Sequence, residues 1–288
     1  MRRLLVGIVG SFVLLACRAE PAPAPVTQWT PAQISSPQFE SHPAFDPVTG
    51  DLWFVRSRPD FTDWQLYVSP CGATGWRAPS RAPISGDGVD ADPWFSPDGA
   101  TLWFISNRSA AGISRTDTDI WRATRIRGGR WSAPERLPAP INSEAYEWYP
   151  RIGPDGWLYF GSGRSGGLGN VDIWRARQSS DGAWRVENAG SAINTSGGEY
   201  EAQPSADGRF MIVEADDGYY RSERGVVGWS ERRRLGPEIN VNGSEIGAAV
   251  SPSGWSMLFA RATSALSGEL CLVRWGAGEA WPPTCPRR

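Results

Sequence analysis

The sequence contains no lysine and only one histidine, His42, among its 288 residues. The absence of lysine excludes a Schiff-base lysine and the lysine of a phosphate-binding loop, and a single imidazole cannot build a multi-histidine zinc site. The formal net charge is −2, so there is no electrostatic reason to expect a nucleic-acid partner. We therefore expect no cofactor, and we assign no catalytic residue.

The N-terminus has the pattern of an exported protein. Arg2 and Arg3 precede an apolar run over residues 4–16, which is too short to span a bilayer but suits the core of a signal peptide. The run ends in Leu-Leu-Ala-Cys at residues 14–17, which resembles the lipobox of bacterial lipoproteins. That resemblance implies cleavage before Cys17 and acylation of its sulfur. The alternative is an ordinary signal peptide followed by a chance cysteine.

The residue after the acylated cysteine guides lipoprotein sorting, in which an aspartate favours the inner membrane. Arg18 stands here, so the resemblance implies an outer-membrane lipoprotein facing the periplasm, with the cell surface as the alternative. The chain then divides into a signal peptide (1–16), a lipidated cysteine with a Pro/Ala-rich linker (17–27) and one domain (28–288). In this division only the lipid anchor contacts a membrane.

Five units of related sequence follow one another within the domain. Each begins with an acidic residue, passes through a tight turn and enters a short apolar or aromatic strand, and the leading acids lie 46 to 57 residues apart. Pro-Asp-Gly at 97–99 and at 154–156 is a reverse-turn sequence, and the flanking aromatic and β-branched residues favour strands. Four short strands per unit predict an all-β protein, a β-propeller of four-stranded blades.

The number of blades depends on the two ends of the domain. Residues 28–32 and residues 281–284 both have the sequence of a closing strand. Five repeats predict five blades, the last of which is completed by the N-terminal strand. A ring of six blades, one of them incomplete, is the alternative, because two candidate closing strands are one too many for a ring of five.

The second and third units resemble the TolB-type propeller repeat of periplasmic proteins. The matching residues of the second unit are Asp90 and residues 96–99, 106–108 and 119–121. The fourth and fifth units depart from the family pattern at residues 214–217 and 261–263. The resemblance is therefore specific for the fold, whereas propellers as a class carry out many unrelated functions.

The resemblance also implies a type of function. The best-known member of the family works through protein contacts, which favours a non-enzymatic module that binds a periplasmic or outer-membrane protein, or an envelope polymer. The alternatives are a carbohydrate-active enzyme, either a polysaccharide hydrolase or a lyase, and a glycan-binding propeller that uses exposed tryptophan faces. An asymmetric acidic pair in one open funnel would favour the enzyme, and aromatic rings along one rim would favour the glycan binder.

The acids that lead the five units are candidate ligand or cation sites. They are Glu40, Asp90, Glu147, Glu199 and Glu245. If each lies on the innermost strand of its blade, the carboxylates face a common axis and could hold a cationic peptide or Ca²⁺, although we predict no bound metal. We favour a structural role, in which each acid accepts hydrogen bonds from backbone amides or arginines.

Three polar residues lie two positions after a leading acid. On a regular strand Asp92 and Glu201 would share the face of the acid that precedes them, because side chains alternate with a period of two. His42 has the same place in the first unit. We expect this histidine to face the channel or to pack against neighbours, rather than to act as a catalyst.

Two further pairs of charged residues recur in the second and third units. Asp119 follows Arg108, and Asp172 follows Arg164, at similar places in the repeat. We predict an ion pair within each unit.

Three cysteines remain if Cys17 is acylated. Cys271 and Cys285 flank a predicted hairpin and form our candidate disulfide in an oxidising compartment. The alternative pairs Cys71 with Cys285, which would join the first and last units.

Tryptophan is abundant, at 16 residues. Ten of them occupy recurring places in the units, where we expect them to pack blade against blade. The other six fall outside those places and are the ones to inspect for function: Trp64, Trp94, Trp148, Trp157, Trp255 and Trp275.

Overall fold

The computed structural model describes residues 25–110, 112, 115–263, 267–276 and 278–285. Over these residues the regular secondary structure consists of β-strands, and no helix long and apolar enough to cross a membrane is found among them. The predicted all-β class is confirmed. The expected signal peptide and Cys17 lie outside the described residues.

The first three repeat units each form four strands. Unit 1 contains β2 (Phe39–Phe45), β3 (Leu52–Ser57), β4 (Gln65–Ser69) and β7 (Ser80–Arg81). Unit 2 contains β8 (Asp90–Phe95), β9 (Thr101–Ser106), β10 (Asp119–Thr124) and β11 (Glu135–Arg136). Unit 3 contains β12 (Glu147–Ile152), β13 (Leu158–Ser162), β14 (Asp172–Gln178) and β15 (Trp184–Asn188).

The last two units follow the same order. Unit 4 contains β16 (Glu199–Pro204), β17 (Phe210–Ala215), β18 (Gly218–Glu223) and β19 (Arg233–Arg234). Unit 5 contains β20 (Ile246–Val250), β21 (Ser256–Ala262) and β22 (Gly268–Arg274), and β1 (Thr27–Gln28) pairs antiparallel with β22. A two-stranded hairpin in unit 1 is formed by β5 (Cys71–Gly72) and β6 (Gly75–Trp76).

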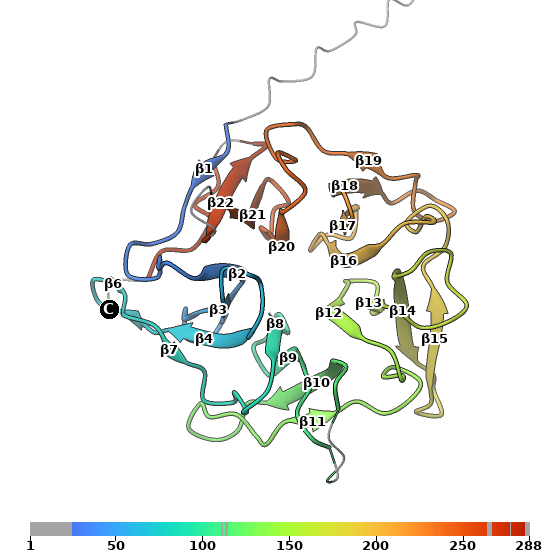
Figure 1. Ribbon diagram of the computed structural model, residues 1–288, viewed down its shortest axis with the longest axis horizontal. Helices are drawn as coiled ribbons and strands as arrows, with labels where there is room; N and C mark the ends of the chain where they lie inside the picture. Colours follow the sequence, from blue (N-terminus) through green and yellow to red (C-terminus); the bar gives the residue numbers. More distant parts are fainter. Residues whose placement is uncertain (1–24, 111, 113–114, 264–266, 277, 286–288) are drawn as a thin grey trace, which may run out of the picture.

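The sheets lie around a common centre (Figure 1). Units 2, 3 and 4 are separate four-stranded sheets, whereas unit 5, β1 and unit 1 form one eight-stranded sheet through a single pairing between Phe39 and Gly268. The first strand of each unit lies innermost, and these inner strands contact one another in the order β2, β8, β12, β16, β20 and back to β2. This propeller-like arrangement brings five strand segments of equivalent sequence to the middle of the molecule.

A tight turn joins each inner strand to the next strand of its unit. Every such turn has a glycine with a positive φ between 67° and 78°, a conformation that glycine adopts at little cost: Gly50, Gly99, Gly156, Gly208 and Gly254. The side chain of Asp98 illustrates the rest of the turn, because it accepts hydrogen bonds from the hydroxyl of Ser96 and from the amide of Ala100. The predicted reverse turns are therefore formed as the sequence indicates.

Every inner strand contains a β-bulge shortly after its leading acid. The pairing register shifts between Ser41 and Ala44 in β2 and at the equivalent place in β8, β12 and β20, whereas in β16 it shifts between Glu199 and Glu201. The bulged residues His42, Asp92 and Tyr149 have positive φ values of 51°, 56° and 52°. In all three cases proline follows, which lacks the N–H that a ladder hydrogen bond needs. The bulge ends the regular alternation, so Asp92 does not share the environment of Asp90 as predicted.

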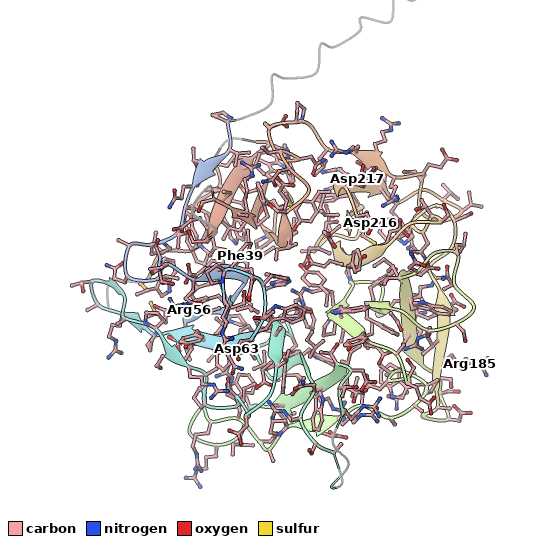
Figure 2. All side chains as sticks on the ribbon, viewed as in Figure 1. Phe39, Arg56, Asp63, Arg185, Asp216 and Asp217 are labelled. Atoms are coloured by element: carbon pink, nitrogen blue, oxygen red, sulfur yellow. The ribbon has the colours of Figure 1, made fainter. Side chains whose placement is uncertain are left out.

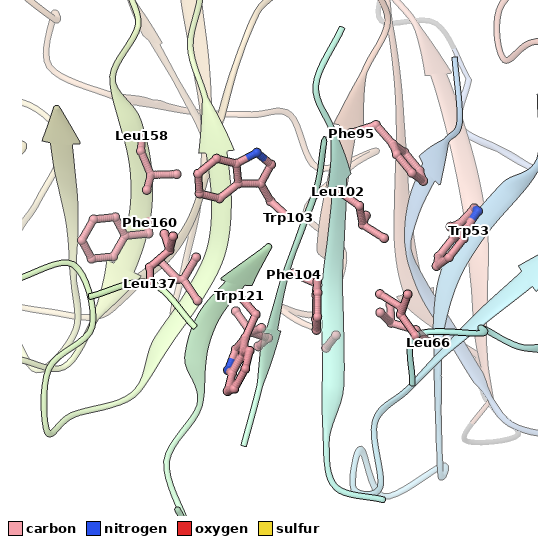
Figure 3. Packing of buried hydrophobic residues seen from close by; sticks show 14 of the residues in the cluster. Trp53, Leu66, Phe95, Leu102, Trp103, Phe104, Trp121, Leu137, Leu158 and Phe160 are labelled. Atoms are coloured by element: carbon pink, nitrogen blue, oxygen red, sulfur yellow. The ribbon is translucent and has the colours of Figure 1, made fainter. Parts of the chain in front are cut away.

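Aromatic and aliphatic side chains pack between neighbouring units. Figure 3 shows Trp53, Trp103 and Trp121 among the buried side chains of the largest cluster, which runs across units 1 to 3. These three indoles are at most 6% exposed. At about 25 cal/mol per Å² and about 200 Å² per indole, each contributes roughly 5 kcal/mol of gross stabilisation. Tryptophans in recurring places thus pack unit against unit.

Candidate functional site

The five leading acids are part of the scaffold in this structure. All five are completely buried, and each binds one arginine: Arg56, Arg108, Arg164, Arg232 and Arg261, in chain order. Each carboxylate also accepts the backbone N–H of the residue four positions earlier, as Glu147 does from Ser143 at 3.1 Å. Burial raises the pKa of Glu147, although hydrogen bonds from Ser143 and the charge of Arg164 oppose this. These carboxylates fix the loop that enters each unit and do not line a cavity.

The arginines engaged in this way are not available for the predicted pairs in units 2 and 3. Arg108 binds Asp90 rather than Asp119, which is held by Arg136 and Arg115 instead. Arg164 likewise binds Glu147. The prediction of an Arg108–Asp119 pair and of its equivalent in unit 3 was therefore wrong, because the leading acid lies on the strand beside the arginine.

The residues at the bulges meet at the centre of the molecule. His42 of unit 1 places Nε2 2.8 Å from Oε1 of Glu201 in unit 4 and 3.2 Å from Oδ1 of Asp92 in unit 2. Asp92 also accepts the amide of Tyr149 in unit 3 at 2.8 Å, and Glu201 accepts the amide of Gly247 in unit 5 at 2.8 Å. One hydrogen-bonded network, here called the central layer, thus joins all five units.

This network requires a glycine at position 247. Its φ is +68°, and a Cβ at this position would lie 2.6 Å from the backbone nitrogen of His42. A larger residue would therefore displace the histidine from between its two carboxylates.

The central layer carries a cation between two carboxylates. Burial lowers the pKa of His42, but the charges of Asp92 and Glu201 and the hydrogen bond that Nε2 donates to Glu201 outweigh burial, so the net shift is upward. Burial raises the pKa of Asp92, against the opposing effect of the nearby imidazolium. The upward shift favours the protonated ring of His42, as its place between two acidic partners implies.

Glu214 adds a fourth titratable group beside the central layer. It lies on β17 directly opposite Glu201 on β16, and its side chain is buried, with the residue 8% exposed. Within the described part of the chain, nothing donates a hydrogen bond to its carboxyl group or pairs with it. Burial raises its pKa well above the usual range, and the charges of Glu201 and Asp216 add to this effect. The upward shift favours the neutral form of Glu214, which has both a donor and an acceptor to offer.

The sequence contained a signal for Glu214 that the repeat analysis passed over. Aligned on the repeat, this position is Val55, Ile105, Gly161 and Ala260 in the other units. A carboxylate in a place otherwise apolar breaks the symmetry of the repeat. Glu201 and Glu214 are thus the asymmetric acidic pair that we did not identify from the sequence.

These polar groups line a cavity of about 310 Å³ at one end of the inner strands. His42, Asp92, Glu201 and Glu214 are buried, whereas the four aromatic residues that line it are partly exposed and so lie nearer the solvent: Phe61, Trp64, Trp148 and Tyr200. We call these four side chains the aromatic rim. The cavity therefore combines buried polar groups with the apolar side chains of Val55, Ala91 and Ile246, and it has an aromatic entrance.

The aromatic rim is held in place by its neighbours. Tyr146 stacks on Trp148 with ring centres 5.5 Å apart and an interplanar angle of 10°. Tyr200 donates its hydroxyl hydrogen to Asp216 at 2.9 Å, in the turn between β17 and β18 where Figure 2 labels Asp216 and Asp217. Trp64 donates its indole N–H to the carbonyl of Phe61 at 2.6 Å. The rings are thus fixed before any ligand arrives, which lowers the entropic cost of binding.

Of the six tryptophans outside the recurring places, Trp64 and Trp148 line this cavity. Trp94 lines a second cavity at the opposite ends of the inner strands. No group of three or more histidine, cysteine or acidic side chains suited to a metal ion is found in the ranges given above for the structure.

All three cysteines of the domain carry free thiols in this structure. Cys271 is buried in β22, with Gln28 of β1 as its strand partner. Cys285 lies instead beside Cys71. Burial raises the pKa of Cys285 to about 12, and a hydrogen bond with the thiol of Cys71 acts in the same direction. The geometry thus brings together the alternative pair, and the Cys271–Cys285 disulfide remains a prediction.

Comparison with known proteins gives similarity in fold. No family model matches the chain, and no curated protein is similar to it in sequence. An endo-arabinase from Bacteroides thetaiotaomicron superimposes with a TM-score of 0.51 at 14% identity, over 88% of this chain and 99% of that one. A gluconolactonase from Xanthomonas campestris gives 0.48 at 13% identity, over 90% and 98% of the two chains.

TolB from Acinetobacter baumannii is a third structural neighbour, with a TM-score of 0.46 at 18% identity. The match covers 86% of this chain but only 57% of TolB, so the present chain spans little more than half the length of that protein. At such low identities the similarity concerns the fold and not the activity. With the all-β composition, the four-stranded sheets and the arrangement around a centre, it places this chain among proteins of β-propeller fold.

Proposed function

We propose that the chain is a lipid-anchored β-propeller of the cell envelope that binds a saccharide segment of an envelope polymer in its central cavity. The observation that carries the proposal is the composition of that cavity, buried polar groups below an aromatic rim. Of the two partner classes expected from the sequence, a protein and an envelope polymer, this cavity favours the polymer. Anchoring through Cys17 at the outer membrane, facing the periplasm, is part of the proposal.

The chemistry of a sugar ring fits each part of the cavity. The apolar C–H face of a pyranose or furanose packs on an aromatic ring such as Trp148. Its hydroxyls donate to the carboxylate oxygens of Glu201, each of which has a lone pair to spare, and accept the proton of Glu214. His42 lies within 3.2 Å of both Asp92 and Glu201, so the acidic groups of this site already have a basic partner. A neutral polar ligand therefore suits this site better than a strongly charged one.

We further propose that the propeller is a closed ring of five blades, one for each repeat unit. In this ring β1 is the fourth strand of unit 5, which agrees with its pairing to β22. Residues 281–284, the other candidate closing segment, contain no strand. The contacts of β20 with both β16 and β2 support five rather than six members.

Saccharide binding is tested by titrating the purified protein with disaccharides of pentoses, hexoses and N-acetylhexosamines, followed by ligand-observed NMR or calorimetry. We expect at least one to bind, and Trp148→Ala to weaken it by about tenfold, because a stacked ring is worth about 1 kcal/mol or more. Trp255→Ala is the matched control, since Trp255 is 51% exposed and lines neither cavity. If no disaccharide binds but a periplasmic protein does so through the aromatic rim, the protein-interaction function is the correct one.

Hydrolysis of the bound saccharide is a second candidate function, favoured by the place of Glu214 opposite Glu201 and by its raised pKa. Glu214 would give its proton to the glycosidic oxygen as the C–O bond breaks. Glu201 would take a proton from the water whose oxygen attacks the anomeric carbon. Release of reducing ends from a bound disaccharide, lost in Glu214→Gln while binding persists, would establish this activity. Binding without release would leave the protein a binding module.

A further inference from the structure

A second cavity, of about 640 Å³, lies at the other ends of the inner strands. It shares no lining residue with the first cavity. Its base consists of residues four positions after the leading acids, one from each inner strand: Ala44, Trp94, Arg151, Gln203 and Ala249. The inner strands therefore contribute to two separate cavities, one toward each end.

The walls of the second cavity are mostly apolar, with Ser96, Ser205 and Gln203 as neutral polar members. Seven prolines line it, and proline offers no backbone N–H to a ligand. The other large side chains of the wall are aromatic or aliphatic: Phe45, Trp94, Phe95, Ile152, Val250 and Trp281. Across the described residues, Arg151 is the one charged side chain among those lining it. An apolar ligand with a single negative charge would match this composition.

The guanidinium of Arg151 is buried but only partly satisfied. It is 3% exposed and lies over the ring of Tyr149, with 3.5 Å from its central carbon to the ring centre. Nε donates to Gln203 at 3.1 Å, and Nη1 donates to the carbonyls of Asp92 and Pro150 at 3.2 and 2.9 Å. The guanidinium also forms a hydrogen bond with the hydroxyl of Tyr149. The bonds assigned to Nε and Nη1 leave Nη2 with donor capacity within the described residues. A buried cation with donors to spare is a recognition element for an anion.

We propose that this second cavity binds a carboxylate carried on an apolar group, with the carboxylate on Nη2 of Arg151 and the apolar group against the proline and aromatic walls. The volume lies within the range of sites for small ligands and would hold a group the size of a dipeptide. Such a carboxylate has two sources, a free organic acid or the C-terminus of a peptide chain. The proposal does not depend on saccharide binding, which uses different residues.

The test compares probes that differ only in charge. Hexanoate and hexanol are titrated into the folded protein and followed by ligand-observed NMR, and a short apolar peptide is used with a free and with an amidated C-terminus. We expect hexanoate to bind about tenfold or more tightly than hexanol. Tighter binding of the free peptide than of hexanoate, lost on amidation, identifies a chain terminus as the source, whereas binding of hexanoate alone identifies a free acid. Equal affinity for hexanoate and hexanol, or no carboxylate binding at about 10 mM, overturns the proposal.

Two variants locate the binding. Arg151→Gln keeps an amide donor but removes the charge, and we expect it to weaken hexanoate by about tenfold or more. Because Arg151 is buried and could be needed for folding, Ala249→Leu is the second variant, which narrows the cavity beside Arg151 and leaves the guanidinium in place. Trp148→Ala, in the other cavity, should leave hexanoate binding unchanged. Full affinity for hexanoate in Ala249→Leu would show that the site lies elsewhere.

Discussion

Replacement of His42 by asparagine should strongly destabilise the folded protein. The imidazole is buried between Asp92 and Glu201, with 3.2 and 2.8 Å between the paired atoms, so its loss leaves two carboxylates facing each other without a cation. Removing one partner of a buried ion pair costs about 3–5 kcal/mol. Asparagine recovers about 1 kcal/mol through one hydrogen bond to a carboxylate. We expect a net loss of about 2–4 kcal/mol in the free energy of unfolding.

Asparagine is chosen because His42 has a φ of +51°. Asparagine tolerates this left-handed conformation better than most residues, so the variant tests the charge and not the backbone. Urea denaturation gives the free energy of unfolding, and a change of this size lowers Tm by about 5–15 °C in a domain of this length. Arg209→Gln is the control, because it breaks the ion pair of Arg209 with Asp207. The side chain of Arg209 is 83% exposed, so we expect the free energy of unfolding to change by less than about 1 kcal/mol.

The pH dependence separates a charged imidazole from a merely packed one. The folded-state pKa of His42 is raised above its ordinary value of 6.5, because its two carboxylate partners outweigh burial, the largest single effect. Its stabilising contribution is therefore complete below pH 6.5 and is lost as the pH rises through the folded-state pKa. The difference between wild type and His42→Asn should be larger at about pH 6 than at about pH 9. A difference below about 1 kcal/mol, or one that is constant over this interval, would refute a charged central layer.

Three further predictions concern other parts of the chain. Glu147→Gln should lower the free energy of unfolding by about 3 kcal/mol, measured by urea denaturation, with little change in saccharide affinity, because this carboxylate is buried against the scaffold. Cys17→Ser should release the protein from membranes in a fractionation, and unchanged membrane association would exclude the lipid anchor. Mild oxidation with diamide should join Cys71 to Cys285, detected by peptide mapping without reductant; a peptide that links Cys271 to Cys285 would instead support the other pairing.

The repeat architecture could be predicted from the sequence because its signals are local. Each Pro-Asp-Gly turn and each aromatic strand is specified by neighbouring residues, and five copies average out the irregularities of any one. The structural role favoured for the leading acids is also consistent with the arginine and backbone partners that the structure gives them. Which arginine binds which acid depended on strand registry, and Arg108 was assigned to the wrong partner for that reason.

The centre of the molecule could not be predicted in the same way. A period-two pattern placed Asp92 on the same strand face as Asp90. In the structure a β-bulge at Asp92, which Pro93 follows, breaks this alternation and turns Asp92 toward the axis. The meeting of His42 with Glu201 joins residues 159 positions apart, which no local pattern reveals. Glu214 could have been found, since it breaks the symmetry of the repeat.

The pairing of β1 with β22 also limits when this part of the fold can form. Just after β1, Thr30 contacts Leu270, 240 positions later in the chain, so β1 cannot pair until β22 has been synthesised. Contacts of such long range form slowly, because closing a long loop costs conformational entropy before the contacts can offset that cost. Unit 5 can therefore be completed only after β22 has been synthesised. If the chain crosses a membrane unfolded, this unit stays incomplete until β22 has also crossed.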